Sequence, residues 1–302
     1  MDWFHRLPDN LKGIAFLMLA SIGFSVMALL IKLLGQRLHV TQILLLRQIG
    51  MLLLVLPAIL PDFPGSLRSA RPGLQLLRMV FALIAMLGGF TAVIHLPLAD
   101  ATAIFFAKSF FVTIFAMLFL GEAVGRYRWG AVVIGFIGVL IMLQPGTAEF
   151  SIYSLASLAG AAGAAAVMIC LRAVSQYDSA NTILTWSSVG IGLAMAFPGV
   201  YFWQWPTHFE WALLGGLAVA SYIGQKCNIY AYKHGEASLL ASLDYVRLIW
   251  ATLLGYLVFS HFPGAPTWIG ASIVITAAIF TIYRETQRKR KLTAADAGLG
   301  EE

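Results

Sequence analysis

Ten almost uncharged, apolar stretches follow one another along this 302-residue chain, and they restrict the fold more than any other feature. A helix needs roughly 20 apolar residues to cross a hydrocarbon core of about 30 Å, although short helices manage with about 17. Only 11% of the residues are charged, against about 25% in soluble domains, so a bilayer is the expected solvent. We predict an all-α integral membrane protein with spans at residues 11–34, 41–60, 73–96, 98–120, 129–144, 151–173, 181–203, 209–232, 237–259 and 266–283.

The connections between these stretches are short and contain turn-forming residues, for example Pro61 to Gly65 and Gln144-Pro145-Gly146. Pro and Gly end helices where water can satisfy the freed backbone groups. No soluble domain is therefore expected in the loops. The first apolar run is long and lacks a small-residue cleavage site, so we expect it to act as a signal anchor.

The basic residues predict the orientation of the chain in the membrane. The basic residues of the connections and the tail fall on one side of the membrane, except Lys32 and Arg37. Positive residues mark the cytoplasmic side, so both termini are expected in the cytoplasm. The expected location is the inner (plasma) membrane. The net charge of +6 follows from this bias and from the basic segment 284–291, which is expected at anionic lipid headgroups. No nucleic-acid partner is needed to explain it, and residues 292–302 are expected to be a flexible end.

The two halves of the chain are weakly similar to each other. Residues 42–44 match residues 182–184, and Asp100-Ala101-Thr102 matches Glu236-Ala237-Ser238 in the same order. Each half holds an odd number of spans, so the second half must enter the membrane upside down, which is an inverted repeat. The expected units are two five-helix halves and a cytoplasmic tail, at residues 1–146, 147–284 and 285–302.

Several short motifs then identify a family resemblance. The run Leu98-Ala99-Asp100-Ala101-Thr102-Ala103-Ile104 is followed by Leu120-Gly121-Glu122, Trp129-Gly130 and Gly135-Phe136-Ile137-Gly138. Together they resemble the EamA-type domain of the drug/metabolite transporter superfamily. The resemblance covers the chain as two such domains and is weaker in the second, where Leu257-Val258-Phe259 replaces the Leu-Gly-Glu step. It implies a ten-helix alternating-access carrier with a cavity lined by helices 1, 3, 4, 6, 8 and 9, with helices 5 and 10 peripheral. It implies no particular substrate.

Among the ionisable residues of the predicted spans, the candidates for a site are Arg47, Lys108, Lys226, Asp244 and Arg247. Each costs roughly 2.5 to 3.5 kcal/mol to insert, so such residues normally face the protein interior and have a partner or a purpose. Asp244 and Arg247 share a helical face, and Lys108 occupies the repeat-equivalent place in the fourth span. One interpretation is a structural ion pair that fixes the register of two helices. The other is a substrate site.

The surplus of cations favours the substrate site, because one carboxylate does not neutralise four cations. We therefore expect a substrate with at least one negative group, held by Lys108 and Arg247. Asp244 would receive a substrate ammonium, serve as a counter-ion or carry a proton. Lys226 is expected to contribute from the cytoplasmic side, and Arg47 either contributes or extends toward the outer headgroups.

Aromatic and amide side chains near these charges complete the expected pocket. Phe105 and Phe111 flank Lys108, and Tyr245 precedes Arg247, which suits ring stacking or cation–π contact, although such rings also face lipid. Gln225 and Asn228 offer hydrogen bonds around Lys226.

Two further features concern movement and helix packing. Glu122 is expected to pair with Arg126 as a gate or a loop-ordering ion pair. Ala156, Gly160 and Ala164 follow the small-xxx-small spacing that lets helix backbones approach closely.

Enzymatic function is not expected, because the spans carry no His-Glu-x-x-His, Gly-x-Ser-x-Gly or phosphate-loop motif. Cys170 and Cys227 are expected to be buried fillers, and no cofactor or metal is expected. The predicted function is secondary transport of a small carboxylate-bearing metabolite, either amino-acid-like or an organic anion. The alternatives are a carrier for a neutral or cationic metabolite, such as a vitamin, a sulfonium nucleoside or a polyamine, and a membrane scaffold without transport. The expected partners are a small-molecule substrate and membrane lipid, and a homodimer is compatible with the sequence.

Overall fold

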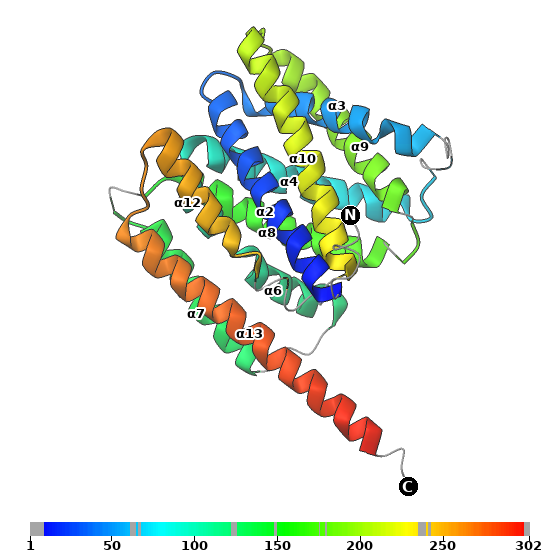
Figure 1. Cartoon of the computed structure of the whole chain (residues 1–302), viewed down its shortest axis with the longest axis vertical. Helices are drawn as coiled ribbons and strands as arrows, with labels where there is room; N and C mark the ends of the chain where they lie inside the picture. The colour runs from blue at the N-terminus through cyan, green and yellow to red at the C-terminus, as the bar shows by residue number, and fades with distance from the viewer. Residues whose placement is uncertain are drawn as a thin grey trace.

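The computed structural model describes residues 9–60, 65, 68–121, 126–147, 150–174, 176–178, 180–234, 240 and 243–298. Regular secondary structure within these ranges is helical throughout. Figure 1 shows the helices, which are α2 (Asp9–Leu34), α3 (Val40–Ile59), α4 (Pro72–His95), α5 (Leu98–Phe105), α6 (Lys108–Leu120), α7 (Arg126–Leu143), α8 (Ile152–Val174), α9 (Ala180–Tyr201), α10 (His208–His234), α12 (Val246–Phe259) and α13 (Ala265–Gly298).

The lengths of the helices agree with a membrane environment. Five stretches are long and apolar enough to cross a bilayer, namely Leu11–Leu34, Val40–Pro57, Pro72–His95, Leu98–Phe119 and Ile152–Leu171. Shorter apolar stretches lie in α7, α12 and α13. The described part of each predicted span is mainly helical, and the first residues of the ninth span lie largely outside the described residues.

The fourth predicted span is not one continuous helix. It divides at Phe106 and Ala107 into α5 and α6, where backbone N–H groups bond three residues back: Phe106 to Ala103 at 3.2 Å and Ala107 to Ile104 at 3.0 Å. A matching turn at Asp244 and Tyr245 precedes α12. Neither turn contains Pro or Gly, so no local sequence signal marks these breaks.

The last helix extends into the predicted tail. Helix α13 continues without a break to Gly298, and the flexibility of residues 292–302 stays a prediction. The segment after Tyr283 consists mostly of Arg, Lys, Gln, Glu, Ala and Leu, which favour helix and contain no breaker before Gly298. Figure 1 shows this end of α13 projecting beyond the bundle.

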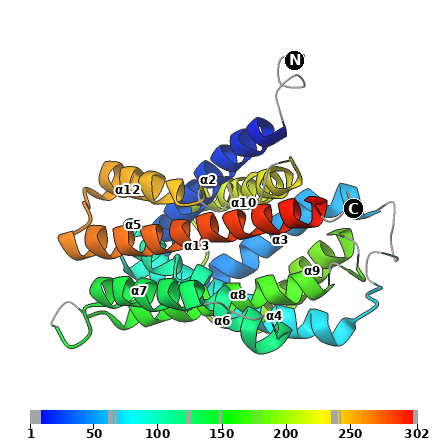
Figure 2. The same ribbon diagram turned by 90° about the horizontal axis from the view of Figure 1, so that it is seen from below.

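The helices pack in pairs whose members are far apart in the sequence. Helix α4 lies along α8, α2 along α10, α3 against α9, and α7 along α13 (Figures 1 and 2). Two main buried apolar clusters result. One joins α5, α6, α7 and α13 to the start of α12, and the other joins α2, α3, α4, α9 and α10.

Glycines allow the close approach of α4 and α8. A methyl group added at Gly88 would lie 2.4 Å from the Ala156 carbonyl oxygen, and one added at Gly160 would lie 2.7 Å from the Gly89 nitrogen. A methyl group added at Gly163 would lie 2.8 Å from the Ala85 nitrogen. The packing role predicted for the small-residue run of residues 156–164 is therefore confirmed.

We expect Gly88→Ala to destabilise the folded protein by about 1 to 3 kcal/mol, because the neighbouring atoms are backbone and cannot rotate away. Thermal unfolding in detergent would measure the change. Gly130→Ala in α7 is the matched control, because nothing lies within 4 Å of its added methyl group. It should leave the unfolding temperature unchanged or raise it slightly. Equal behaviour of the two variants would contradict this account of the α4–α8 contact.

Candidate substrate site at two facing helix breaks

The two helix breaks touch each other inside the bundle. The rings of Phe106 and Tyr245 meet edge to face with centroids 4.7 Å apart. The Ser109 and Tyr245 hydroxyl oxygens lie 3.4 Å apart. Arg247 and Leu248 donate backbone bonds only three residues back, to Asp244 and Tyr245, so the backbone is tightened on this side as well. Irregular backbone at membrane depth is tolerated where it is buried in protein or lines a cavity, which makes this contact a candidate substrate site.

The charges that the sequence singled out gather at these breaks. The Arg247 guanidinium donates to the Asp244 carboxylate at 2.8 Å, and both side chains are mostly buried. The Lys108 ammonium at the start of α6 interacts electrostatically with both of them. The central carbon of the Arg247 guanidinium group lies over the Phe24 ring on α2, 4.6 Å from the ring centroid. The predicted cluster of Lys108, Asp244 and Arg247 therefore exists, and it includes the predicted Tyr245.

Part of this cluster has hydrogen-bonding capacity that the protein does not use. Three buried polar atoms lack a hydrogen-bond partner in the described part of the chain: Arg247 Nε, Trp250 Nε1 and Thr252 Oγ1. All three lie in the first two turns of α12. Arg247 Nε and Trp250 Nε1 are donors only, so the group that would satisfy them must be an acceptor.

The predicted aromatic residues differ in their surroundings. Phe105, at the end of α5, is half-buried and lies against Gly89 of α4. Phe111 points into an aromatic cluster, with its ring centroid 6.0 Å from that of Phe115 and 5.5 Å from that of Phe136 on α7. Direct substrate contact by Phe105 and Phe111 stays a prediction.

The residues predicted on α10 lie on a helix that reaches the Phe24 ring beside Arg247, since a methyl group added at Gly224 would lie 3.2 Å from this ring. Lys226 is exposed and donates to the Tyr222 hydroxyl at 3.2 Å on its own helix. Gln225 and Asn228 are half-buried. Their role in binding substrate also stays a prediction.

Arg47 does not extend toward the membrane surface. Its side chain is only 3% exposed and donates to Ser221 Oγ at 3.0 Å and to Gln48 Oε1 at 2.7 Å. The guanidinium also lies 5.8 Å from the centroid of the Phe90 ring. The headgroup interpretation is therefore wrong, because partners on three helices surround this cation within the bundle.

The proposed gate is beyond the described structure. Glu122 lies outside the described residues, and Arg126 begins α7 with a side chain that is outside the described part. Of the two cysteines, Cys170 is buried, as predicted, whereas Cys227 is half-buried.

A polar network surrounds the start of α4 and was not predicted from the sequence. The Asp178 carboxylate, between α8 and α9, accepts hydrogen bonds from the Ser69 hydroxyl, from the Ala70 amide at 2.8 Å and from Gln75 Nε2 at 2.8 Å. Gln75 in turn accepts from Arg78 Nε at 3.0 Å. The network ties the segment before α4, and α4 itself, to the α8–α9 connection.

Arg78 extends the same network to α9. Its terminal nitrogen donates to the Ile183 carbonyl at 3.1 Å and to Ser187 Oγ at 2.7 Å. Arg78 is one of the basic residues whose distribution predicts the orientation of the chain, and it was not predicted to be buried. Its position within the apolar run that follows Pro72 was the available sign that it is buried.

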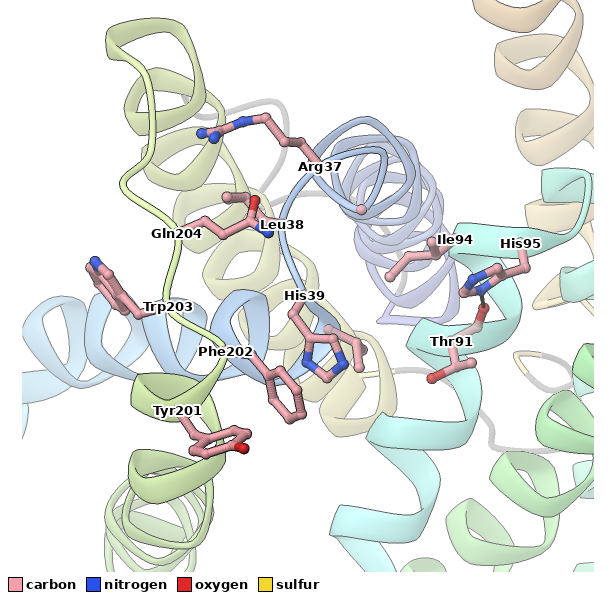
Figure 3. Close-up of a pocket in the computed structure, with 12 residues that line it drawn as sticks. Arg37, Leu38, His39, Thr91, Ile94, His95, Tyr201, Phe202, Trp203 and Gln204 are labelled. Carbon is pink, nitrogen blue, oxygen red and sulfur yellow. Dashed lines mark hydrogen bonds between the residues drawn. The ribbon is translucent and has the colours of Figure 1, made fainter.

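A cavity of about 580 Å³ lies elsewhere, where α2, α4 and α9 end. Its lining includes Arg37, His39, His95, Phe202 and Gln204 (Figure 3). None of these residues was predicted to belong to a site.

Comparison with known proteins decides the family. The EamA-like transporter family matches residues 11–144. The riboflavin transporter of Vibrio cholerae is 30% identical over 231 residues, which cover 75% of this chain and 76% of that protein. This chain belongs to the EamA-like transporter family.

Other similar proteins are also transporters, in agreement with this family. The S-adenosylmethionine uptake transporter of Rickettsia prowazekii is 28% identical over 92% of this chain and 95% of its own length. The pseudopaline exporter of Pseudomonas aeruginosa is 28% identical over 90% of this chain and 96% of its own length. A crystal structure covering 91% of this chain superposes with a TM-score of 0.59 at 19% identity, which supports the fold.

The family and the apolar helices together define a multi-pass protein of the plasma membrane that moves small metabolites. Its family and relatives are transporters rather than enzymes.

Acid should weaken the Asp178 network of the transporter. Burial alone would raise the pKa of Asp178, but the bonds from Ser69, Gln75 and the Ala70 amide outweigh burial and hold this pKa below its usual value. A depressed carboxylate pKa stabilises the fold above the unfolded-state pKa, and this contribution is lost as the pH falls toward the folded-state pKa.

We therefore expect the wild-type unfolding temperature to fall between about pH 5 and pH 3 more steeply than that of Asp178→Asn. The variant should also be less stable at neutral pH. Ser69→Ala removes one donor and should move the acid-dependent loss to higher pH. Parallel pH profiles for the wild type and Asp178→Asn would contradict this role.

Proposed function

We propose that this transporter is a secondary active carrier for a small carboxylate-bearing metabolite and works by alternating access. The observation that carries the proposal is the pair of unsatisfied buried donors near the start of α12, Arg247 Nε and Trp250 Nε1, together with the electrostatic interaction of Arg247 with Lys108. A carboxylate is an acceptor-only group that matches two such donors. Leaving buried donors unsatisfied is costly, so their presence favours a ligand.

The charge of the cluster points in the same direction. Lys108 and Arg247 supply two positive charges, and Asp244 supplies one negative charge that Arg247 already engages. The three groups therefore carry an excess of one positive charge, which one substrate carboxylate would balance. Asp244 would also accept a substrate ammonium group, so an amino-acid-like substrate matches all three side chains.

The relatives both support and widen this choice. S-adenosylmethionine, the substrate in the name of one relative, contains an α-carboxylate and an α-ammonium group, and such a headgroup would pair with Lys108, Arg247 and Asp244. The riboflavin transporter is named for a ligand without a carboxylate. A neutral or cationic metabolite is therefore the second candidate, and Asp244 with the ring of Phe24 nearby favours a cationic group in that case.

The helix pairing supports the inverted repeat. In such a repeat, the contact between spans 1 and 8 corresponds to the contact between spans 6 and 3. Both contacts are present, as α2 with α10 and as α8 with α4. Spans 2 and 7, and spans 5 and 10, would each pair with their own counterpart, as α3 with α9 and α7 with α13 do. The fourth and ninth spans are both interrupted. We infer two five-helix halves, residues 1–146 and 147–284, with the site between them and both termini in the cytoplasm.

In this orientation the Asp178 network lies at the cytoplasmic end and would act as an inner gate. It links α4 of the first half to α9 of the second half through Gln75 and Arg78. Opening toward the cytoplasm would require these bonds to separate. Glu122 with Arg126 remains a second proposed gate element, and contacts with lipid or a second copy of the chain remain compatible with this mechanism.

Lys108→Gln and Arg247→Gln should each reduce substrate affinity by about 30-fold or more, because the loss of one partner from a buried charged contact costs at least about 2 kcal/mol. The first measurement is ligand-dependent thermal stabilisation of the purified protein. Amino acids, di- and tricarboxylates, flavins and polyamines would be compared with their amides or uncharged analogues. A ligand at 100 times its Kd should add about 2.7 kcal/mol. Counterflow in proteoliposomes then tests transport of the stabilising ligand.

Arg284→Gln is the matched control, because this exposed cation lies outside the breaks, over the Tyr127 ring. Its affinity and counterflow should equal those of the wild type. Stabilisation by cations alone would overturn the carboxylate assignment. Ligand binding without counterflow in a folded protein would favour the scaffold alternative.

A further inference from the structure

The Phe24 ring of α2 is a neutral partner of the buried Arg247 cation. The central carbon of the guanidinium group lies 4.6 Å from the centroid of the Phe24 ring, and a terminal guanidinium nitrogen donates to the Asp244 carboxylate at 2.8 Å. The nearby Tyr245 ring packs against Phe106 instead. Because α2 packs against α12, these two contacts reach Arg247 from separate parts of the chain.

The Phe24 ring is confined on the side of α10. A methyl group added at Gly224 would lie 3.2 Å from Cδ1 and 3.3 Å from Cε1 of this ring. A methyl group added at Gly23 would lie 3.1 Å from the Gly224 Cα atom, so the backbones of α2 and α10 approach closely at this level. The glycine at position 224 thus leaves just enough room for the ring, which is held in place before any ligand binds.

The other side chains of α2 at this level bring no charge to Arg247. The Ser21 hydroxyl donates to the Met18 carbonyl at 2.8 Å, and the Ser25 hydroxyl donates to the Ser21 carbonyl at 2.8 Å. Both hydroxyl groups therefore bond within their own helix. The contribution of α2 to the cation is the aromatic ring.

A ring attracts a cation without cancelling its charge. Lys108 and Arg247 repel each other, and Asp244 supplies the one carboxylate that interacts with both of them in the described part of the chain. A second carboxylate at position 24 would remove the excess positive charge. The Phe24 ring stabilises Arg247 and leaves that excess for an anionic ligand.

We propose that Phe24 is a positioning residue that makes the site select carboxylates over neutral ligands. This inference rests on the carboxylate substrate proposed above. The ring and Asp244 together hold the guanidinium group, so that Arg247 Nε, which has no acceptor in the described part of the chain, stays available to the ligand. Without the ring, Asp244 alone would hold the group, and Nε would face the ligand for only part of the time. Phe24 acts through Arg247 and does not itself contact the carboxylate.

The test is isothermal titration of the purified full chain in detergent with L-methionine and with L-methioninamide. Both compounds carry an α-ammonium group at about pH 6.5 and an uncharged side chain, but only methionine has a carboxylate. The wild type should bind methionine more tightly than the amide. Phe24→Leu should weaken methionine binding by about 5- to 10-fold, the size of one desolvated cation–π contact, and leave methioninamide binding unchanged.

Two further variants separate positioning from packing. Phe24→Tyr keeps the face of the ring and should bind methionine within about 2-fold of the wild type. Phe16→Leu is the matched control, because it makes the same change on α2 at a ring that stacks with Tyr230 and His234 rather than with Arg247. It should bind both compounds as the wild type does. Thermal unfolding without ligand shows which variants are folded.

Three outcomes would overturn the role of Phe24 alone: unchanged methionine binding in a folded Phe24→Leu protein, equal weakening of both compounds, or a Phe24→Tyr protein as weak as Phe24→Leu. Greater weakening of the amide would also overturn it, because the ring would then contact the ammonium group of the ligand. A wild type that binds neither compound, or both equally, would contradict the proposed carboxylate substrate and this inference with it.

Discussion

Backbone hydrogen bonding inside the bilayer controls what this protein can do at its centre. A break in a helix frees N–H and C=O groups, and lipid offers no partner for them. The break at Phe106 and the break at Asp244 meet each other through Phe106, Ser109 and Tyr245, and bonds to residues three positions back retain part of the pairing. Shielding from lipid thus brings Lys108, Asp244 and Arg247 together, so the same contact supports the fold and creates the candidate site.

The buried cations differ in how completely the protein satisfies them. The Lys32 ammonium donates to the last carbonyls of α4, with the shortest bond, 2.6 Å, to Leu96. Arg78 has a side-chain amide, a hydroxyl and a carbonyl as partners, and Arg47 has Ser221 and Gln48. Arg247, in contrast, pairs through one nitrogen and leaves Nε without an acceptor in the described part of the chain. A buried cation with an unused hydrogen-bond donor is a candidate for binding a ligand, whereas a cation whose donors all have protein partners holds helices together.

Patterns of single residues predicted the helices and the central charges, and the internal repeat related Lys108 to Asp244, whereas the other contacts between distant segments were not predicted. Hydrophobic length located the spans, and the scarcity of charge within them identified Lys108, Asp244 and Arg247. The break at Phe106 was missed because neither Pro nor Gly marks it. Arg47 was ambiguous because its depth depends on α10, which supplies Ser221. The Asp178 network and the His39–His95 cavity join residues far apart in the chain, so spacing along the sequence gives no indication of them.

The continuation of α13 gives the chain a helical extension. From Arg284 to Gly298 the helix adds roughly 20 Å at 1.5 Å per residue. The basic segment therefore lies on this helix, and its distance from the membrane depends on the tilt of α13. A tilt of about 10° at the membrane boundary would displace Gly298 by roughly 4 Å on this geometry. Because α13 packs along α7, any movement of this helix pair would be amplified at the chain end.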